Sequence, residues 1–497
     1  MLPYKTLLAL DRAARRPLYL QITKALIRHI SAGVIGPGTK LPGSRRLATM
    51  LAVNRRTVAA AYEELEAQGW VEVRPNQGCF VRDTLPLVRG RVLSTLAAIE
   101  APQAAHFPLR PASDLLIEPH LPRPTGTMLT LSDGHPDVQL APMKELAKNF
   151  SFILNHPGTH SLMNYTQSFR GDRRLREVLI TYLAETRGLR ISLDHIVLTR
   201  GSLMAFYLLG QTLLAPGDAV IVGEPGYNEG HNTLTLAGGR LLRVPVDEDG
   251  LDVDAVEALC RTHRVRAVYT VPHHHYPTTV SLSAARRMRL LALAEAHRLA
   301  IIEDDYDYDF HYAGSPILPM ASSDYAGVVA YVGSLSKIIA PSLRLGFIVG
   351  PPDLITAVTQ RSRFLDSFGN TALERAVAML FESGSIRRYL KKAVRTYAER
   401  RDVFCQALQR ELGPYATCTP PEGGLAAWVR LDESVPLEAV VAEAAARGVR
   451  LPDRSFFCGP GQTLNATRMG FASLTPAKME RALAVLRASL EAVRQRS

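Results

Sequence analysis

A lysine lies among small and apolar residues in the run SLSKIIAPSLRLG, which spans residues 334–346. Ser334 precedes this residue, Lys337, and Arg344 follows it. Hydroxyl and guanidinium groups are common partners of a bound phosphate, and a lysine amine can form a Schiff base with a carbonyl compound. Residues 334–346 therefore indicate a nucleophilic amine beside a phosphate-binding segment.

Two other segments carry side chains that would complete such a site. IIEDDYD, residues 301–307, holds Asp304 and Tyr306, and EPGYNEG holds Tyr227. Pyridoxal 5′-phosphate (PLP) is an aldehyde cofactor that needs a lysine amine, a carboxylate for its pyridinium nitrogen and partners for its phosphate. We expect Asp304 to supply that carboxylate. Tyr227 would stack on the cofactor ring, and Tyr306 would hydrogen-bond to its 3′ oxygen.

The elements that would position these residues follow an α/β pattern from about residue 126 onward. Apolar strands alternate with helical stretches, which is typical of a largely parallel sheet, and ligands collect at the carboxyl ends of such strands. Four apolar segments end in polar residues: DAVIVGEPGY, AVYTVPHHHYPTT, LAIIEDDYDYDF and VVAYVGSLSK. In a fifth, HIVLTRGSLMAFYLLGQTLL, the backbone N–H groups of Gly201, Ser202 and Leu203 open a helix and would hold the phosphate. We therefore predict one PLP site at this sheet edge.

Each motif alone is weak evidence, because Ser-x-Ser-Lys is common and a run such as EDDYD is usually a solvated loop or an imitation of a metal site. The consecutive residues His273, His274 and His275 also suggest a metal. Adjacent residues on a strand point to opposite faces, however, and no second cluster of ligand residues is visible in the sequence. We expect these histidines to line a pocket or form hydrogen bonds, and we predict no metal site.

The composition favours a globular protein of two or three domains, since 497 residues are too many for one ordinary core. No run of about 18 uncharged apolar residues appears, which argues against a membrane span. The N-terminal sequence lacks the pattern of a secretory signal, so we expect the protein in the cytoplasm. The five cysteines are odd in number and form no CxxC pair, which predicts free thiols in a reducing compartment.

The N-terminal region carries most of the excess positive charge. Residues 1–83 hold 13 Lys and Arg against 6 Asp and Glu, a net charge of +7, whereas the whole chain has a net charge of +11. A basic surface can serve solubility alone. On a small separate domain it is also typical of a protein that binds the phosphate backbone of a nucleic acid.

The same region predicts three helices and a hairpin. The first helix would start at Pro17 and stop at Gly33, Ser44 would cap a second, and Asn54 would cap a third that ends at Gly69. WVEVRPNQGCFVRD then alternates apolar and polar residues on both sides of a Pro-Asn-Gln-Gly turn, which predicts a two-stranded hairpin. This order is that of a winged helix-turn-helix.

This region resembles the GntR-type winged-helix DNA-binding domain through its LP-x-S-R, R-x-T-V and wing glycine positions. The resemblance implies that Arg55, Arg56 and Thr57 open a recognition helix and reach base edges and phosphates in the major groove. Arg45 would clamp the DNA backbone, and Gly78 would let the wing approach the minor groove. Alternatively these arginines only face solvent, although at a helix start they oppose the helix dipole. The family's wing usually has glycine where this chain has Asn76, which tolerates positive φ.

The larger part of the chain resembles the fold-type-I aminotransferases over residues 126–497. The resemblance rests on IIEDDYD, on S-x-SK-x-x-x-P-x-LRLG in residues 334–346, and on RMGF at residues 468–471. It implies a mostly parallel sheet, a smaller C-terminal α+β lobe, and a carboxylate-binding role for Arg468. The alternative for Arg468 is a salt bridge at a strand end. Residues 15–83 would then be the winged helix, and residues 84–125, with seven prolines and a possible short helix RVLSTLAAIE, a linker.

Two departures from the aminotransferase pattern bear on chemistry. Aminotransferases usually read NPTG where an asparagine binds the 3′ oxygen of the cofactor, whereas this chain reads HYPTT, with Tyr276 in the asparagine position and Thr279 for glycine. This change fits a regulator better than an efficient enzyme. Glu229 stands where some relatives carry arginine, and it would favour a cationic or hydroxylated part of an effector.

The whole chain thus resembles the MocR-type regulators, in which a GntR-type winged helix is fused to an aminotransferase-like domain. The resemblance implies a PLP-dependent transcriptional regulator that binds double-stranded operator DNA and senses a small amino compound or PLP itself. It also implies a homodimer with head-to-tail exchange of the winged helices. There are two alternatives. One is a working aminotransferase that carries a DNA-binding arm. The other is a DNA-binding protein whose enzyme-like domain binds no cofactor and serves only to dimerise. The complete basic winged helix argues against the first, and the intact Lys337, Asp304, Ser334 and Arg344 argue against the second.

Overall fold

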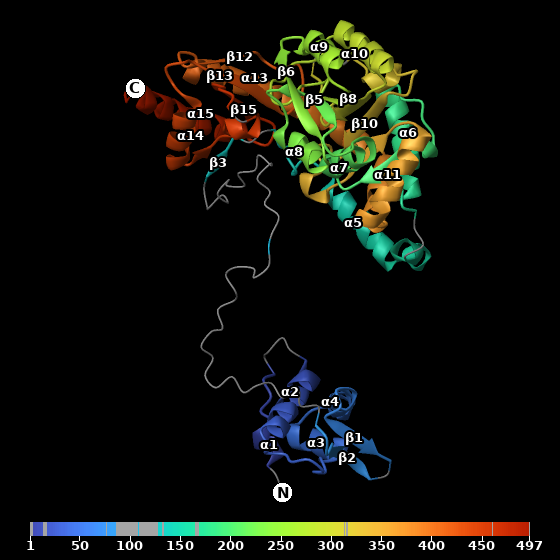
Figure 1. Cartoon of the computed structure of the whole chain (residues 1–497). Coiled ribbons are helices and arrows are strands. Elements are labelled where there is room, and N and C mark those ends of the chain that lie inside the picture. The colour runs from blue at the N-terminus through green and yellow to red at the C-terminus, as the bar shows by residue number, and fades with distance from the viewer. Residues whose placement is uncertain are drawn as a thin grey trace. The chain divides into compact units, whose positions relative to one another are not determined.

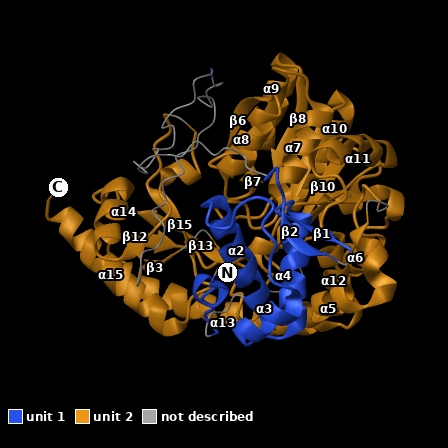
Figure 2. Ribbon diagram, turned by 90° about the horizontal axis from the view of Figure 1, so that it is seen from below, with its two compact units in different colours: residues 1–110 blue, residues 111–497 orange. Residues whose placement is uncertain are grey.

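The chain forms two compact units, residues 1–110 and residues 111–497, which are coloured separately in Figure 2. The computed structural model describes residues 3–12, 17–75, 77–85, 108, 128–131, 134–164, 168–312, 314, 317–459 and 461–496. The linker predicted over residues 84–125 and its short helix lie outside the described residues, apart from residues 84, 85 and 108. Asn76 in the wing lies outside them too.

The first unit is a winged helix-turn-helix, as the sequence predicts. Its elements are α1 Tyr4–Leu7, α2 Leu18–Ser31, α3 Ser44–Leu51, α4 Arg55–Ala67, β1 Val71–Arg74 and β2 Gly78–Val81. The strands β1 and β2 pair in antiparallel fashion. The apolar faces of the helices share one core that includes Ile22, Leu26, Leu47, Val58 and Leu65, so α3 and α4 are held as a rigid pair. The short helix α1 is an element that the sequence did not predict.

Four of the five predicted helix boundaries in this unit are confirmed, including the start of α2 at Pro17 and its stop at Gly33. The Asn54 side chain accepts a hydrogen bond of 2.8 Å from the backbone N–H of Arg56, and Gly69 follows α4 with φ of +77°. The prediction that Ser44 caps α3 is wrong. Gly43 holds the N-cap position and Ser44 is the first helical residue, so the Ser44 hydroxyl is free to lie 3.5 Å from Nε of Arg55.

The second unit is built around an eight-stranded, mostly parallel sheet with the order β4-β11-β10-β9-β8-β5-β6-β7. The strands are β4 Ile196–Thr199, β5 Ala219–Glu224, β6 Arg240–Asp247, β7 Gly250–Leu251, β8 Val265–Thr270, β9 Ala300–Asp305, β10 Val329–Ser334 and β11 Gly346–Val349. In this sheet β11 and β7 run opposite to the other six strands. The polar ends of the parallel strands therefore meet at one edge, as expected.

Helices cover both faces of this sheet, as Figure 1 shows. They are α5 Met143–Asn155, α6 Arg173–Arg187, α7 Ser202–Leu213, α8 Asn228–Leu236, α9 Val253–Thr262, α10 Ala284–His297, α11 Pro352–Leu365 and α12 Thr371–Glu382, with the 3-10 helices η1 Pro157–Met163, η2 Leu193–His195, η3 Met320–Ser323 and η4 Pro341–Leu343. Because side chains alternate along β9, Ile302 packs with α7 and α11, and Ile301 packs with α6 and α10. Asp304 consequently shares the face of Ile302.

The C-terminal lobe is a smaller α+β structure, as predicted. Its antiparallel strands are β12 Ala416–Cys418, β13 Ala426–Leu431 and β15 Ala466–Gly470, and its helices are α13 Ser385–Leu412, α14 Leu437–Ala446, η5 Arg454–Phe456 and α15 Pro476–Arg494. A second small sheet joins β3 Leu129–Thr130 to β14 Val449–Arg450. No helix within the described ranges is both long and apolar enough to cross a bilayer.

Candidate functional site

A cavity of about 240 Å³ at the carboxyl ends of the strands collects most of the predicted cofactor residues. It is lined by His135, Ser202, Tyr227, Glu229, Tyr276, Asp304, Tyr306, Ser334, Ser336, Lys337, Pro341 and Arg344. Gly201 directly precedes Ser202, and the Leu203 side chain packs against the core beneath α7. Arg468 reaches the cavity wall through contacts with Tyr306 and Tyr276.

Asp304 is the most distinctive group of the cavity. The Tyr269 hydroxyl donates a hydrogen bond of 2.8 Å to its Oδ2 atom, and its Oδ1 atom is buried with no hydrogen-bond partner among the residues described. Burial raises the pKa of the Asp304 carboxyl to about 7, which the hydrogen bond from Tyr269 and the charge of Lys337 partly oppose. A buried acceptor without a partner is costly, so this carboxylate is suited to a ligand that brings a cationic N–H group.

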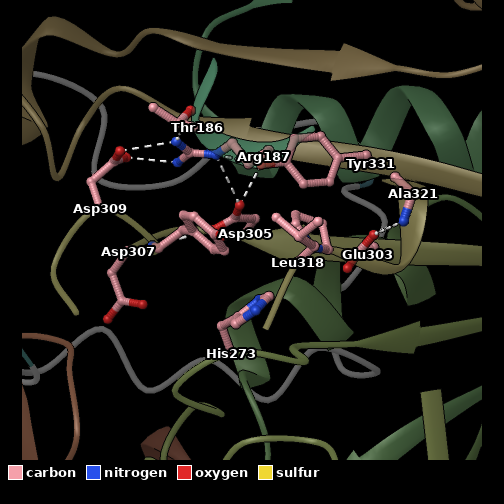
Figure 3. Close-up of polar contacts among 12 residues, drawn as sticks. Thr186, Arg187, His273, Glu303, Asp305, Asp307, Asp309, Leu318, Ala321 and Tyr331 are labelled. Atoms are coloured by element: carbon pink, nitrogen blue, oxygen red, sulfur yellow. Dashed lines mark hydrogen bonds and ion pairs between the residues drawn. The ribbon is translucent and has the colours of Figure 1, made fainter. Parts of the chain in front are cut away.

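The neighbouring acidic residues of β9 point to the other face and are satisfied by the protein. Figure 3 shows Asp305 and Asp309 on either side of Arg187. The Arg187 guanidinium donates hydrogen bonds of 2.9 Å and 2.7 Å to the two oxygens of Asp309, and it lies 3.4 Å from Asp305. Glu303 accepts hydrogen bonds from the backbone N–H groups at the start of η3. The run is thus a buried ion-pair network, not a solvated loop, and it fixes the strand that carries Asp304.

The start of α7 and the segment after β10 form a cradle of donors. Gly201 caps α7 with φ of +78° and no side-chain cap, and a Cβ atom there would lie only 2.8 Å from Nη2 of Arg344. The Ser336 hydroxyl is buried and, within the described part of the chain, has no hydrogen-bond partner. Ser202 and Ser334 line the same cavity. The uncapped helix N-terminus, the hydroxyls and the guanidinium together suit a phosphate.

Lys337 and Arg468 both lie close to Gly134. The Lys337 amine donates a hydrogen bond of 3.1 Å to the Gly134 carbonyl oxygen. The Arg468 guanidinium, which is 0% exposed, donates to the Tyr306 hydroxyl and to the Pro277 carbonyl oxygen, both at 3.0 Å. A Cβ atom on Gly134 would lie 3.5 Å from Nη2 of Arg468. Gly134 therefore lies near both an amine and a guanidinium, the two groups that an amino acid would need.

The aromatic wall of the cavity consists of Tyr227 and Tyr276. Their rings meet edge to face at 5.1 Å, and the Arg468 guanidinium lies over the Tyr276 ring at 5.0 Å. The Tyr227 hydroxyl donates a hydrogen bond of 2.8 Å to Glu229, whose side chain does line the cavity. Thr279, at the glycine position of the aminotransferase pattern, adopts φ of +64°.

The three histidines follow β8 in a turn, and the assumption that they occupy a strand is wrong, because β8 ends at Thr270. They are buried and hydrogen-bonded as expected: His273 to the Ile317 carbonyl, His274 to Asp307 at 2.8 Å and His275 to Thr278 at 2.9 Å. In the parts of the chain that are described, no group of three or more His, Cys, Asp or Glu side chains is arranged to hold a metal ion.

The sequence reasoning missed several residues of the site. Tyr269 is the penultimate residue of β8, and the apolar pattern of that strand gave no sign that its hydroxyl bonds to Asp304. Ser336, His135 and Gly134 were not assigned a role. Ser336 could have been found from its place next to Lys337, whereas only the folded chain brings residues 134 and 135 to the sheet edge.

The predicted DNA-binding residues lie on the first unit, described here by itself. Arg45 in the first turn of α3 and Arg55 and Arg56 in the first turn of α4 are exposed, while Thr57 is half-buried. In the wing, Gly78 has φ of +115°, and a Cβ atom there would lie 3.1 Å from Cε of Lys40. The unit thus presents cations at two helix starts and beside the wing.

Comparison with known proteins finds two family matches in the chain. Residues 127–486 match the family model for aminotransferase class I and II, and residues 18–81 match that for bacterial regulatory proteins of the gntR family. The probable rhizopine catabolism regulatory protein MocR of Rhizobium meliloti is 28% identical over 98% of this chain and 96% of its own. The chain belongs to the MocR-type transcriptional regulators.

Other relatives of this MocR-type regulator include both regulators and enzymes. The uncharacterized HTH-type transcriptional regulator YdfD of Bacillus subtilis is 30% identical over 87% of this chain and 88% of that protein. Among solved structures, the kynurenine aminotransferase of Pyrococcus horikoshii in complex with PMP is 26% identical, with a TM-score of 0.69 over 74% of this chain and 92% of that chain. The second unit of this MocR-type regulator therefore has the fold-type-I aminotransferase fold.

Proposed function

We propose that this regulator binds PLP in the cavity of about 240 Å³ and uses it to sense a small amino compound. The observation that carries the proposal is the buried Oδ1 atom of Asp304, which has no protein partner among the described residues and belongs to a residue that lines the cavity. A protonated pyridine nitrogen is the group that would satisfy it. The unpartnered Ser336 hydroxyl at the phosphate cradle supports the same ligand.

Each part of the cavity then has a defined task. Lys337 supplies the amine that joins the cofactor aldehyde, and Asp304 holds its ring nitrogen. Gly201, Ser202, Leu203, Ser334 and Arg344 hold its phosphate through backbone N–H groups, hydroxyls and a guanidinium. Tyr227 packs on the ring, and Tyr306 and Tyr276 reach its 3′ oxygen. When bound, PLP supplies an electrophilic carbon that exchanges Lys337 for the amine of an effector.

Replacing Asp304 with asparagine tests the carboxylate assignment, and it should change stability and cofactor affinity in opposite directions. Burial raises the folded pKa of Asp304 to about 7, above an unfolded value of about 4. Ionisation of Asp304 therefore lowers the free energy of unfolding of the cofactor-free protein as the pH rises from about 4 to about 7. We expect cofactor-free Asp304→Asn to be about 1–3 kcal/mol more stable than wild type at pH 8 and nearly equal at pH 4.

Urea unfolding of both cofactor-free proteins at the two pH values measures this difference. Glu303 and Asp305 titrate in both proteins, so their contributions cancel. The same variant should bind PLP more weakly at pH 8. A stability difference that does not change with pH, or undiminished PLP affinity, would remove Asp304 from its assigned role.

We propose that residues 15–83 form a DNA-binding unit and that this unit binds operator DNA. We further propose that residues 84–125 link it to a sensing domain of residues 126–497. Arg55, Arg56 and Thr57 would enter the major groove, Arg45 would bind phosphate, and Gly78 would bring the wing to the minor groove. These roles are supported by the exposure of the three arginines at helix starts. A positive side chain at such a position opposes the helix dipole, and a phosphate partner would offset that unfavourable interaction.

Alanine at Arg55 or Arg56 is expected to weaken binding to the DNA upstream of the protein's own gene. An arginine that contacts a base should contribute about 1–3 kcal/mol of binding free energy. For an arginine that contacts a phosphate, the slope of log binding constant against log salt concentration should fall in magnitude by about one. Fluorescence anisotropy at several salt concentrations measures both. Lys24→Ala on α2 removes the same charge elsewhere and serves as the control. Unchanged binding in both arginine variants would move the contact to the wing or another surface.

We further propose a homodimer with head-to-tail placement of the winged helices, acting in the cytoplasm. Large apolar side chains are exposed on α5, on η1 and at the end of α11: Met143, Phe152, Leu154, Met163, Phe364 and Leu365. Exposed apolar side chains of this kind mark protein interfaces. Sedimentation of the purified protein tests the assembly, and a monomer that binds DNA normally would contradict it.

A further inference from the structure

The Tyr269 side chain holds one side of the Asp304 carboxylate. Tyr269 lies on β8 and is 2% exposed, and its hydroxyl donates a hydrogen bond of 2.8 Å to Oδ2 of Asp304 on the neighbouring strand β9. The other carboxylate oxygen, Oδ1, is buried and has no hydrogen-bond partner within the described residues. The two oxygens of Asp304 are therefore unequal, because one is held by the protein and the other is left for a ligand.

The helices α7 and α8 fix the position of the Tyr269 ring. Phe206 of α7 and His231 of α8 both meet this ring edge to face, at centroid distances of 5.3 Å and 5.6 Å. A Cβ atom on Gly230 would lie 3.4 Å from the Tyr269 hydroxyl and 2.9 Å from Cδ1 of Tyr227. The absence of a side chain at Gly230 thus lets α8 approach both tyrosines. The ring is held by the two helices whose first turns line the cavity.

The surroundings fix the direction of this hydrogen bond. Burial and the charge of Asp304 raise the pKa of Tyr269 well above its ordinary value, so the hydroxyl keeps its proton and donates it. The hydrogen bond favours the charged form of Asp304 against the effect of burial. His231 stays neutral, because burial lowers its pKa to about 3. The other titratable groups that act on the pair are Tyr227, Tyr306, Asp305, Asp307 and Lys337.

We propose that Tyr269 is a positioning residue for the cofactor, which holds Oδ2 of Asp304 so that Oδ1 is directed at the ring nitrogen of PLP. The inference rests on the proposed binding of PLP. A charged carboxylate in one fixed orientation binds a protonated ring nitrogen more strongly than a neutral or rotating carboxyl group does. Tyr269 is not one of the residues that line the cavity, so it acts on the cofactor through Asp304.

The first measurement uses cofactor-free protein. Tyr269→Phe removes the hydroxyl and keeps the ring that packs against Phe206 and His231. Without the hydrogen bond we expect the pKa of the Asp304 carboxyl to rise by about one unit. Urea unfolding of wild type, both single variants and the double variant with Asp304→Asn measures this change. Asp304→Asn should raise the folding equilibrium constant about ten times more in the Tyr269→Phe background than in wild type at pH 9, and the two substitutions should be nearly additive at pH 4.

The second measurement is the affinity for PLP, from titration of the visible absorbance. Tyr269→Phe should bind PLP at least about tenfold more weakly than wild type. Tyr331→Phe is the matched control, because the buried Tyr331 hydroxyl donates a hydrogen bond to Asp305, the next residue of β9. This control should change neither the PLP affinity nor the pH dependence of the Asp304→Asn effect.

The outcomes separate this inference from the proposed function. A wild-type protein that binds no PLP would contradict the proposed function, whereas the unfolding experiment would still measure the bond between Tyr269 and Asp304. Equal PLP affinities of wild type and Tyr269→Phe, or additive substitutions at pH 9, would overturn the positioning role. An equal loss of PLP affinity in Tyr331→Phe would also overturn it, since the loss would then follow from removing any buried hydroxyl of this sheet.

Discussion

Replacing Lys337 with alanine is expected to abolish the visible absorbance band of the bound cofactor and its covalent attachment to the protein. Lys337 is the lysine that lines the cavity with Asp304 and Arg344, and its amine already points to the Gly134 carbonyl oxygen at 3.1 Å. Without it the aldehyde has no amine partner at this site. The measurement is the absorbance spectrum after addition of PLP, followed by borohydride reduction and peptide mass spectrometry.

A matched control is Lys391→Ala on α13, which removes an exposed lysine. It should retain the full band and the label. If Lys337→Ala still yields a protein reduced onto PLP by borohydride, another lysine holds the cofactor and the site is assigned incorrectly.

Replacing Arg468 with alanine is expected to remove the response of DNA binding to the effector while the PLP spectrum remains. The Arg468 guanidinium is fully buried beside the cavity, where its ion pair with a carboxylate would be little screened by water. Loss of one partner of such a pair typically costs about 2–5 kcal/mol, or a factor of about 30 or more in affinity. The measurement is operator binding as a function of amino acid concentration.

Arg430→Ala is the matched control, because Arg430 lies on the neighbouring strand β13 and is exposed. It should keep the response. An intact PLP spectrum shows that Arg468→Ala is folded, and an unchanged effector response in that folded variant would contradict the role of Arg468 in effector binding.

Local patterns in the sequence predicted those parts of the site that depend on strand ends. Asp304 lies at the end of the apolar strand β9 and Lys337 follows the end of β10, and in a parallel sheet such ends share one edge. Gly201 and Ser202 could be placed because a strand, a tight turn and a helix follow each other within one short segment. The winged helix was predictable for the same reason, since its caps, turns and apolar faces are all local.

Contacts between distant segments could not be predicted from such patterns. Arg187 on α6 meets Asp305 and Asp309 through the fold alone, so the acidic run could not be recognised as buried. Tyr269 was hidden in an apolar strand. Ser44 was misplaced by one position, because Gly43 and Ser44 both suit a helix start and only the backbone geometry distinguishes them.

The central claim is that one cavity joins cofactor, effector and DNA binding. An effector can change DNA affinity only if it binds two conformations of the protein with different affinities. The most direct measurement is a titration of the PLP-loaded protein on labelled operator DNA with a series of amino compounds, recording visible absorbance and DNA anisotropy in the same sample. We predict that one compound changes both signals with the same midpoint, and that Arg468→Ala loses both changes. A compound that shifts the absorbance fully while DNA binding stays constant would contradict the account.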